Sequence, residues 1–157
     1  MIAPCYDSYM NWKYWASGFL LLIVLGIAYY GLSPLFINIE LNEELPQGTS
    51  QSEMSPSAEV VGTTGHPASG TARVIRDGEN TYLRYENFKT INGPDLFVYL
   101  ATDKDATEFI NLGALKATEG NVNYEIPAGT DLSKYKYALI WCRAFGVLFN
   151  SAKLPDF

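Results

Sequence analysis

Residues 15–37 contain no charged side chain, and this apolar segment constrains the chain more than any other feature. At about 1.5 Å of rise per residue, a helix of this length can cross a hydrocarbon core of about 30 Å. Trp12 and Trp15 on one side, and Tyr29 and Tyr30 on the other, are typical of the aromatic belts at membrane interfaces. The sequence therefore predicts a transmembrane anchor over residues 15–37, in contact with membrane lipid.

The charges on the two sides of this segment differ. Lys13 precedes it, whereas Glu40, Glu43 and Glu44 follow it. Basic residues favour the inner side of a membrane. We therefore predict a single-pass protein whose amino-terminal tail, residues 1–14, is cytoplasmic and whose carboxy-terminal domain is extracytoplasmic.

A cleaved signal peptide is the alternative interpretation, because Gly26 and Ala28 could occupy the small-residue positions before a cleavage site. The apolar run continues beyond them through Leu35 and Phe36, which favours an uncleaved anchor. Cys5 precedes the run and is predicted to be an unmodified cytoplasmic thiol.

Residues 38–67 are rich in Glu, Ser, Thr, Pro and Gly and contain no aromatic side chain. This composition predicts a disordered, acidic linker between the anchor and the domain. The linker holds five carboxylates and no Lys or Arg, whereas residues 68–157 hold ten basic and eleven acidic side chains. Because no basic stripe is present to neutralise phosphates, we expect no nucleic-acid partner.

Residues 68–157 consist of short apolar runs separated by turn residues. The runs predict strands at 71–75, 81–85, 95–101, 109–112, 122–126, 137–142 and 147–149. This pattern indicates an all-β fold, an antiparallel β-sandwich of about seven strands. The domain is small, so its aromatic side chains, Phe145 and Phe149 among them, are expected to supply much of the core.

The run at 137–142 places a single cysteine of the domain in an apolar strand. Because strand side chains alternate, Ala138, Ile140 and Cys142 should share one face and Leu139 and Trp141 the other. Both faces are apolar, which is typical of a strand buried between two layers. From the residues alone, Cys142 is either a small packed hydrophobe or a reactive thiol.

The residue inventory excludes several chemistries. His66 is the only histidine and falls in the predicted linker. Blue-copper sites, closed zinc sites, four-cysteine iron–sulfur clusters and Ser-His-Asp triads lack the required ligands, so no metal site is predicted. Haem is compatible with the inventory, because one thiolate can serve as proximal ligand. Arg143 points to the opposite face from Cys142 on an ideal strand, so only a bulge or turn would bring its charge to the sulfur.

Five segments of the domain resemble a known family, the DM-thirteen domain, an electron-transfer-type domain of Skeletor-like cell-surface proteins. The segments are Gly70-Thr71-Ala72-Arg73-Val74, Tyr82-Leu83-Arg84-Tyr85, Gly93-Pro94-Asp95-Leu96-Phe97-Val98, Tyr124-Glu125-Ile126-Pro127 and Ala138-Leu139-Ile140-Trp141-Cys142. The resemblance covers about residues 69–154. One departure is Asn150, which stands after Phe149 where glycine is expected.

The resemblance implies a redox role for Cys142, either as a bare thiol or as a ligand to a group such as haem, with an unidentified redox protein as partner. It favours an electron-transfer module over a stand-alone enzyme. A non-catalytic cell-surface binding or structural module, in which Cys142 is merely packed, is the alternative.

Overall fold

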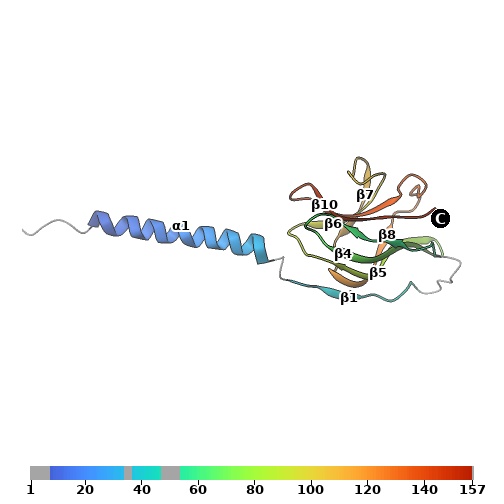
Figure 1. Cartoon of the computed structure of the whole chain (residues 1–157), viewed down its shortest axis with the longest axis horizontal. Helices are drawn as coiled ribbons and strands as arrows, with labels where there is room; N and C mark the ends of the chain where they lie inside the picture. Colours follow the sequence, from blue (N-terminus) through green and yellow to red (C-terminus); the bar gives the residue numbers. More distant parts are fainter. Residues whose placement is uncertain (1–7, 34–36, 47–53, 157) are drawn as a thin grey trace, which may run out of the picture.

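The computed structural model describes residues 8–33, 37–46 and 54–156. One helix, α1 (Ser8–Leu32), is followed by a domain of two β-sheets packed face to face (Figure 1). The carboxy terminus lies at the end of the domain that is remote from α1 (Figure 1). The predicted all-β sandwich is confirmed. The amino-terminal residues 1–7, including Cys5, lie outside the described residues.

The helix α1 is apolar on every side and none of it is buried against the domain. Its segment Trp12–Leu32 has a mean hydropathy of 1.8, and among the described residues it is the helix that is long and apolar enough to cross a bilayer. Its 25 residues span about 37 Å at 1.5 Å per residue. These properties fit a membrane anchor or a signal sequence.

The first sheet has the strand order β1-β8-β5-β4-β2. Its strands are β1 (Glu40–Asn42), β8 (Glu119–Ile126), β5 (Asn80–Thr90), β4 (Ala68–Asp77) and β2 (Ala58–Glu59). The long β4–β5 hairpin turns at Gly78, which has a φ of 61°, and Asp77 pairs with Asn80. Asp77, Gly78 and Asn80 are residues typical of such a turn, and they lie between the strands predicted at 71–75 and 81–85.

The second sheet has the strand order β3-β10-β9-β6-β7, and its pairs are antiparallel. Its strands are β3 (Val61–Gly62), β10 (Val147–Lys153), β9 (Tyr137–Cys142), β6 (Leu96–Ala101) and β7 (Phe109–Ala114). The seven predicted strands correspond to β4 to β10. Strand β9 occupies the centre of this sheet, between β10 and β6.

Two apolar clusters hold the domain together. The main core lies between the sheets and includes Leu83 and Tyr85 from the first sheet and Ile140 from the second. A smaller cluster on the outer face of the second sheet is built around Tyr99, Ala101 and Leu139, with Phe97 and Trp141 partly buried beside them. The expectation that Phe145 belongs to the core is wrong, because its side chain is 71% exposed.

The structure differs from the predicted disordered linker over residues 38–67. In the described parts of this range, β1, β2 and β3 join the two sheets. Strand β1 runs parallel to β8 and passes so close to Gly120 that a Cβ there would collide with the carbonyl oxygen of Leu41. Composition misses these strands because their partners, rather than their own apolar pattern, hold them in place.

Candidate functional site

Cys142 is the last residue of β9, and its side chain faces the main core. It pairs with Val147 on β10 and with Leu96 on β6, and it is 0% exposed. Ala138 and Ile140 share its face and belong to the same core cluster. Leu139 and Trp141 lie in the outer cluster. The predicted division of the two faces of this strand is therefore confirmed.

The loop at residues 91–95 closes the core at the Cys142 end of β9. A Cβ at Gly93 would lie 3.0 Å from Cζ of Phe149 and 3.1 Å from Cδ2 of Leu96. These contacts show that Gly93 passes directly over the two apolar side chains. Leu96 is the cross-strand neighbour of Cys142. Cys142, Leu96 and Phe149 belong to one core cluster, and the loop packs against two of these three side chains.

Arg143 follows Cys142 in the chain, but its guanidinium interacts with Asp95 and Phe97 rather than with the thiol. Its guanidinium donates to both carboxylate oxygens of Asp95, from Nε at 3.1 Å and from Nη2 at 3.2 Å. It also lies 3.5 Å from the centre of the Phe97 ring, and its backbone N–H donates to the Asp95 carbonyl at 3.0 Å. The hydrogen bond that the guanidinium donates to the Asp95 carboxylate raises the pKa of Arg143 above its ordinary value. Arg143 therefore ties the β9–β10 hairpin to the start of β6.

His66 belongs to this end of the fold, although the sequence places it in the linker. Its ring stacks on Phe149 with centroids 4.0 Å apart, and its Nδ1 lies 3.0 Å from Oγ1 of Thr63. Thr63 Oγ1 also lies within hydrogen-bonding distance of the carbonyl oxygens of Leu148 and Phe149. No local sequence pattern predicts these contacts, because the partners lie more than eighty residues apart in the chain.

Asn150 occupies a β-bulge in β10. The register with β9 shifts between Leu148 and Asn150, so the chain continues as a strand where the sequence led us to expect a glycine turn. The side chain of Asn150 is buried and donates from Nδ2 to Thr90 Oγ1 at 3.1 Å, while its Oδ1 has no partner among the described residues. The bulge thus accompanies a side-chain amide, that of Asn150, which is buried in the domain.

The surroundings of Cys142 do not fit a haem. A prosthetic group of that size needs a cavity of several hundred Å³ that opens onto its ligand. The hollow beside the 91–95 loop measures about 270 Å³ and includes Leu96 in its lining, but Cys142 does not line it. Within the described residues, no three His, Cys, Asp or Glu side chains converge in a way that could hold a metal ion. Cys142 is therefore a fully buried thiol within the main core.

The family comparison gives this site a context. The family model described as Electron transfer DM13 matches residues 60–154, which is more than half of the chain and includes β3 to β10. Neither the curated proteins nor the solved structures show a match. The match starts before the predicted domain boundary at residue 68, in agreement with the pairing of β3 in the second sheet. The chain belongs to the DM13 electron-transfer family.

Proposed function

We propose that the chain is a membrane-anchored, outward-facing electron-transfer module in which Cys142 is the redox group and acts as a thiol. The family match supports electron transfer. The apolar helix α1 and the charge difference across it support the anchor and its orientation. The position of Cys142 carries the assignment of the redox group, because it is the free cysteine of the described domain and lies one residue before the exposed hairpin 143–146.

The chemistry of a single thiol is exchange with a disulfide of a partner protein. The Cys142 thiol releases its proton to water, and the thiolate attacks one partner sulfur while the partner disulfide breaks and its second sulfur leaves as thiolate. One thiolate of a second partner, which is a dithiol, then attacks the Cys142 sulfur of the mixed disulfide and releases the first partner as a dithiol. The second thiol of that donor, as thiolate, attacks its own sulfur in the new mixed disulfide, which closes the donor's disulfide and releases Cys142 as thiolate, and this thiolate regains a proton from water. Two electrons pass from the second partner to the first, and this chain returns to its starting state.

Access to the thiol requires local opening of the sandwich end. The 91–95 loop and the 143–146 hairpin cover this end, and the Arg143–Asp95 pair joins them. Both side chains of that pair are partly exposed, at 47% and 35%. Exposed pairs of this kind contribute little to global stability, so the end can open without unfolding the domain.

The alternative is a non-catalytic cell-surface module in which Cys142 only fills space. The full burial of Cys142 favours this alternative, as does the engagement of Arg143 with Asp95 and Phe97. A buried thiol without a neighbouring cation is ordinarily inert.

Thiol exchange in the full chain separates the two functions. In a Cys5→Ser background Cys142 is the only cysteine, and its mixed disulfide with oxidised glutathione is measured by mass spectrometry. Asp95→Asn should speed its formation several-fold by releasing the loop from the hairpin. Asp156→Asn breaks the exposed Lys136–Asp156 pair at the other end of the domain and should leave the rate unchanged. The packed-thiol alternative holds if exchange in every variant occurs only at the rate of global unfolding.

A further inference from the structure

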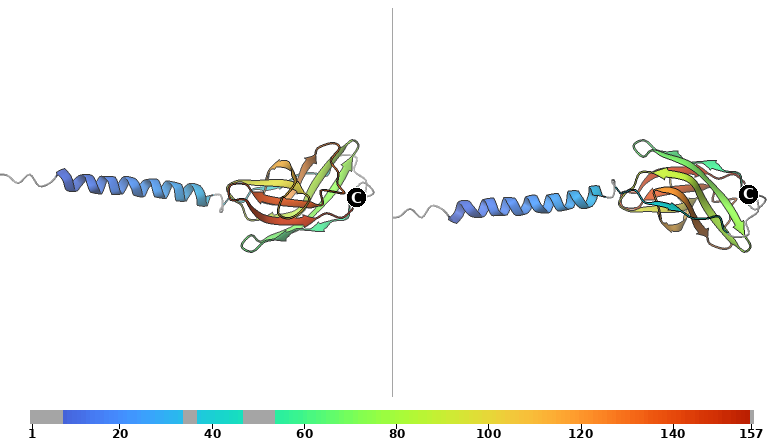
Figure 2. Two further views of the ribbon diagram at one scale, coloured as in Figure 1. Left: turned by 90° about the horizontal axis from the view of Figure 1, so that it is seen from above. Right: turned by 90° about the horizontal axis from the view of Figure 1, so that it is seen from below.

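One end of the sandwich faces α1. It is formed by residues 37–39, 63–67, 91–95, 115–118 and 143–146, because β1, β4, β6, β8 and β10 start there and β9 ends there. We call this the α1-facing end. Figure 2 shows the domain in line with the helix, and the carboxy terminus lies toward the opposite end. The loops of the α1-facing end are joined to one another, since Asn92 donates to the Ile37 carbonyl and Arg143 donates to the Asp95 carbonyl.

The α1-facing end carries exposed apolar side chains. Phe145 at the tip of the β9–β10 hairpin is 71% exposed, Ile37 is 52% exposed and Ile39 is 44% exposed. The opposite end differs, because its turns at 77–80, 102–108 and 127–136 are built mainly from polar and charged residues. A phenylalanine that protrudes at a hairpin tip loses apolar contact with the core and gains none within the described domain.

The chain between α1 and the domain is short. From Ser33 to Ile37 it can extend by at most about 14 Å, at roughly 3.5 Å per residue. Ile37 is already held by Asn92 of the domain at 3.1 Å. A helix that ends in the interfacial layer therefore keeps the α1-facing end within reach of the same layer, which is several Å deep on each side of the bilayer. Strand β1 is paired with β8 from Glu40 onward, so residues 37–42 add no free length between α1 and the sandwich.

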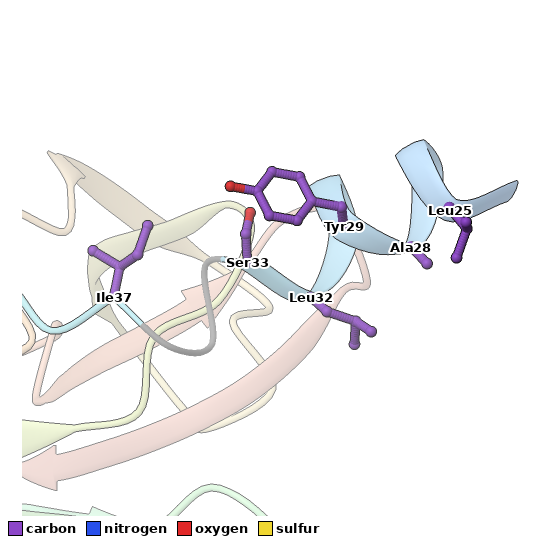
Figure 3. A pocket seen from close by; sticks show the side chains of 6 residues that line it. All are labelled: Leu25, Ala28, Tyr29, Leu32, Ser33 and Ile37. Atoms are coloured by element: carbon purple, nitrogen blue, oxygen red, sulfur yellow. The ribbon is translucent and has the colours of Figure 1, made fainter. Parts of the chain in front are cut away.

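The side chains at the end of α1 and at Ile37 also lie close together. A hollow of about 530 Å³ is lined by Leu25, Ala28, Tyr29, Leu32 and Ser33 of the helix end together with Ile37 (Figure 3). The lining is almost entirely apolar. Tyr29 and Ser33 point their hydroxyl groups to one side of the helix in this view (Figure 3). Apolar surface of this kind is compatible with acyl chains and with the glycerol region, and it continues from the helix onto the domain.

The charges at the α1-facing end are paired. Arg143 pairs with Asp95 at 3.1 Å, and Lys116 pairs with Glu43 at 3.1 Å. Directly beside this end, Lys89 pairs with Glu119 at 3.2 Å. The end therefore presents no excess of positive charge to anionic lipid. Contact with a membrane here must rely on apolar insertion and on the tether, rather than on electrostatic attraction.

We propose that the α1-facing end rests on the bilayer surface that α1 enters, with Phe145, Ile37 and Ile39 in the interfacial layer. This inference rests on the proposed membrane anchor. The partner is the zwitterionic lipid surface itself. Phe145 is the residue that inserts furthest, because it is the most exposed and lies at a hairpin tip.

The test places a fluorescent label at single cysteines in the full chain, in a Cys5→Ser, Cys142→Ala background. The protein is reconstituted in phosphatidylcholine nanodiscs, with or without lipids that carry a doxyl quencher. A nitrobenzoxadiazole label at Phe145→Cys should be quenched at least about twofold more than the same label at Glu79→Cys, in the β4–β5 turn at the opposite end. The quenching should not change when phosphatidylserine is added or when salt is raised, because the charges are paired.

A third label, at Phe19→Cys within α1, separates the two proposals. If the label at 19 is quenched and the label at 145 is quenched no more than that at 79, the helix spans the membrane and the docking is wrong. If the label at 19 is not quenched, the anchor itself is wrong and the docking falls with it. Strong quenching at 19 and 145 together with weak quenching at 79 supports both. Circular dichroism of each variant checks that the domain is folded.

Discussion

The two sheets of the sandwich cover their outer faces with opposite chemistry. On the first sheet, Arg84 donates to the carbonyls of Glu43 and Glu44 and to Asn123 Oδ1, at 3.2, 3.2 and 2.7 Å. On the second sheet, Tyr99 and Leu139 are buried in an apolar cluster beneath Phe109, whose ring stacks on Tyr99 at 4.1 Å. Polar side chains with hydrogen bonds thus lie on the outer face of the first sheet, and packed aromatic side chains lie on the outer face of the second.

The difference shows where each face is vulnerable. Removing a buried apolar side chain leaves a cavity that the whole domain must tolerate. Removing Arg84 instead releases the segment that it holds, Glu43 and Glu44 after β1, while the main core stays intact. The second sheet should therefore lose global stability on mutation, and the first should lose local order at its edge.

Leu139→Ala should have the largest effect. Leu139 is 0% exposed, so the truncation should reduce the free energy of unfolding by about 3 to 4 kcal/mol through lost burial and a cavity. Denaturant unfolding of the full chain in detergent measures it. Val61→Ala, at a side chain that is 53% exposed, is the matched control and should cost about 1 kcal/mol or less. Equal losses in the two variants would mean that the outer cluster contributes nothing special.

Arg84→Met should cost less globally, about 2 kcal/mol, but should change the edge of the first sheet more. The amide of Glu43 donates to the Asn121 carbonyl at 2.8 Å and should exchange with solvent faster in this variant. Hydrogen exchange followed by mass spectrometry measures this. Lys89→Met, which breaks the exposed Lys89–Glu119 pair, should leave that exchange unchanged. Protection of Glu43 that survives Arg84→Met would contradict the local role of Arg84.

Cys142→Ala tests the inner face between the two sheets. The side chain is small, so its loss should cost about 1 to 2 kcal/mol, less than the loss of Leu139. Cys142→Ser should cost more than Cys142→Ala, because the serine hydroxyl enters an apolar core. Thermal unfolding orders the two variants. A serine variant as stable as the alanine variant would indicate that a polar partner or water lies beside the sulfur.

Glu108→Gln should have the smallest effect, and one that depends on pH. Hydrogen bonds from Lys134 and then from Tyr135 lower the pKa of Glu108 below its ordinary value of 4.5. A lowered carboxylate pKa stabilises the folded state above pH 4.5, and the contribution disappears as the pH falls below that value. The melting temperature of the wild type should thus be slightly higher than that of the variant at pH 7, and the two melting temperatures should become equal in acid. A difference that grows in acid would contradict this sign.

The sequence predicts the strands whose residues carry their own pattern. Strand β9 is apolar on both faces, and the structure buries both, in the main core and in the outer cluster. Strand β1 has no such pattern, because Glu40 and Asn42 are exposed. Its position beside β8 depends on two residues that are distant in the sequence. Gly120, about eighty residues after β1, leaves room for the Leu41 carbonyl, and Arg84, about forty residues after β1, binds the Glu43 carbonyl.

The candidate site shows the same limit. The burial of Cys142 follows from alternation along β9, whereas its surroundings do not follow from any local motif. Asp95 meets Arg143 across 48 residues of chain, and His66 meets Phe149 because β3 joins the second sheet beside β10. The prediction for Phe145 is wrong for a different reason. An aromatic side chain is expected to be buried, but the β9–β10 hairpin places this one outside the core.

The short connection between Ser33 and Ile37 bears on how this protein would find its partners. If α1 is the membrane anchor proposed above, a domain tethered so closely to the bilayer would move by lateral diffusion with its helix and would sample a thin layer rather than a volume. Cys142 lies at the end of β9 that points toward that layer, so a soluble protein arriving from the medium would first meet the distant β4–β5 turn. If Cys142 is the redox group proposed above, electron exchange through its thiol would then select a partner that shares the same membrane and presents its own redox group close to the lipid headgroups.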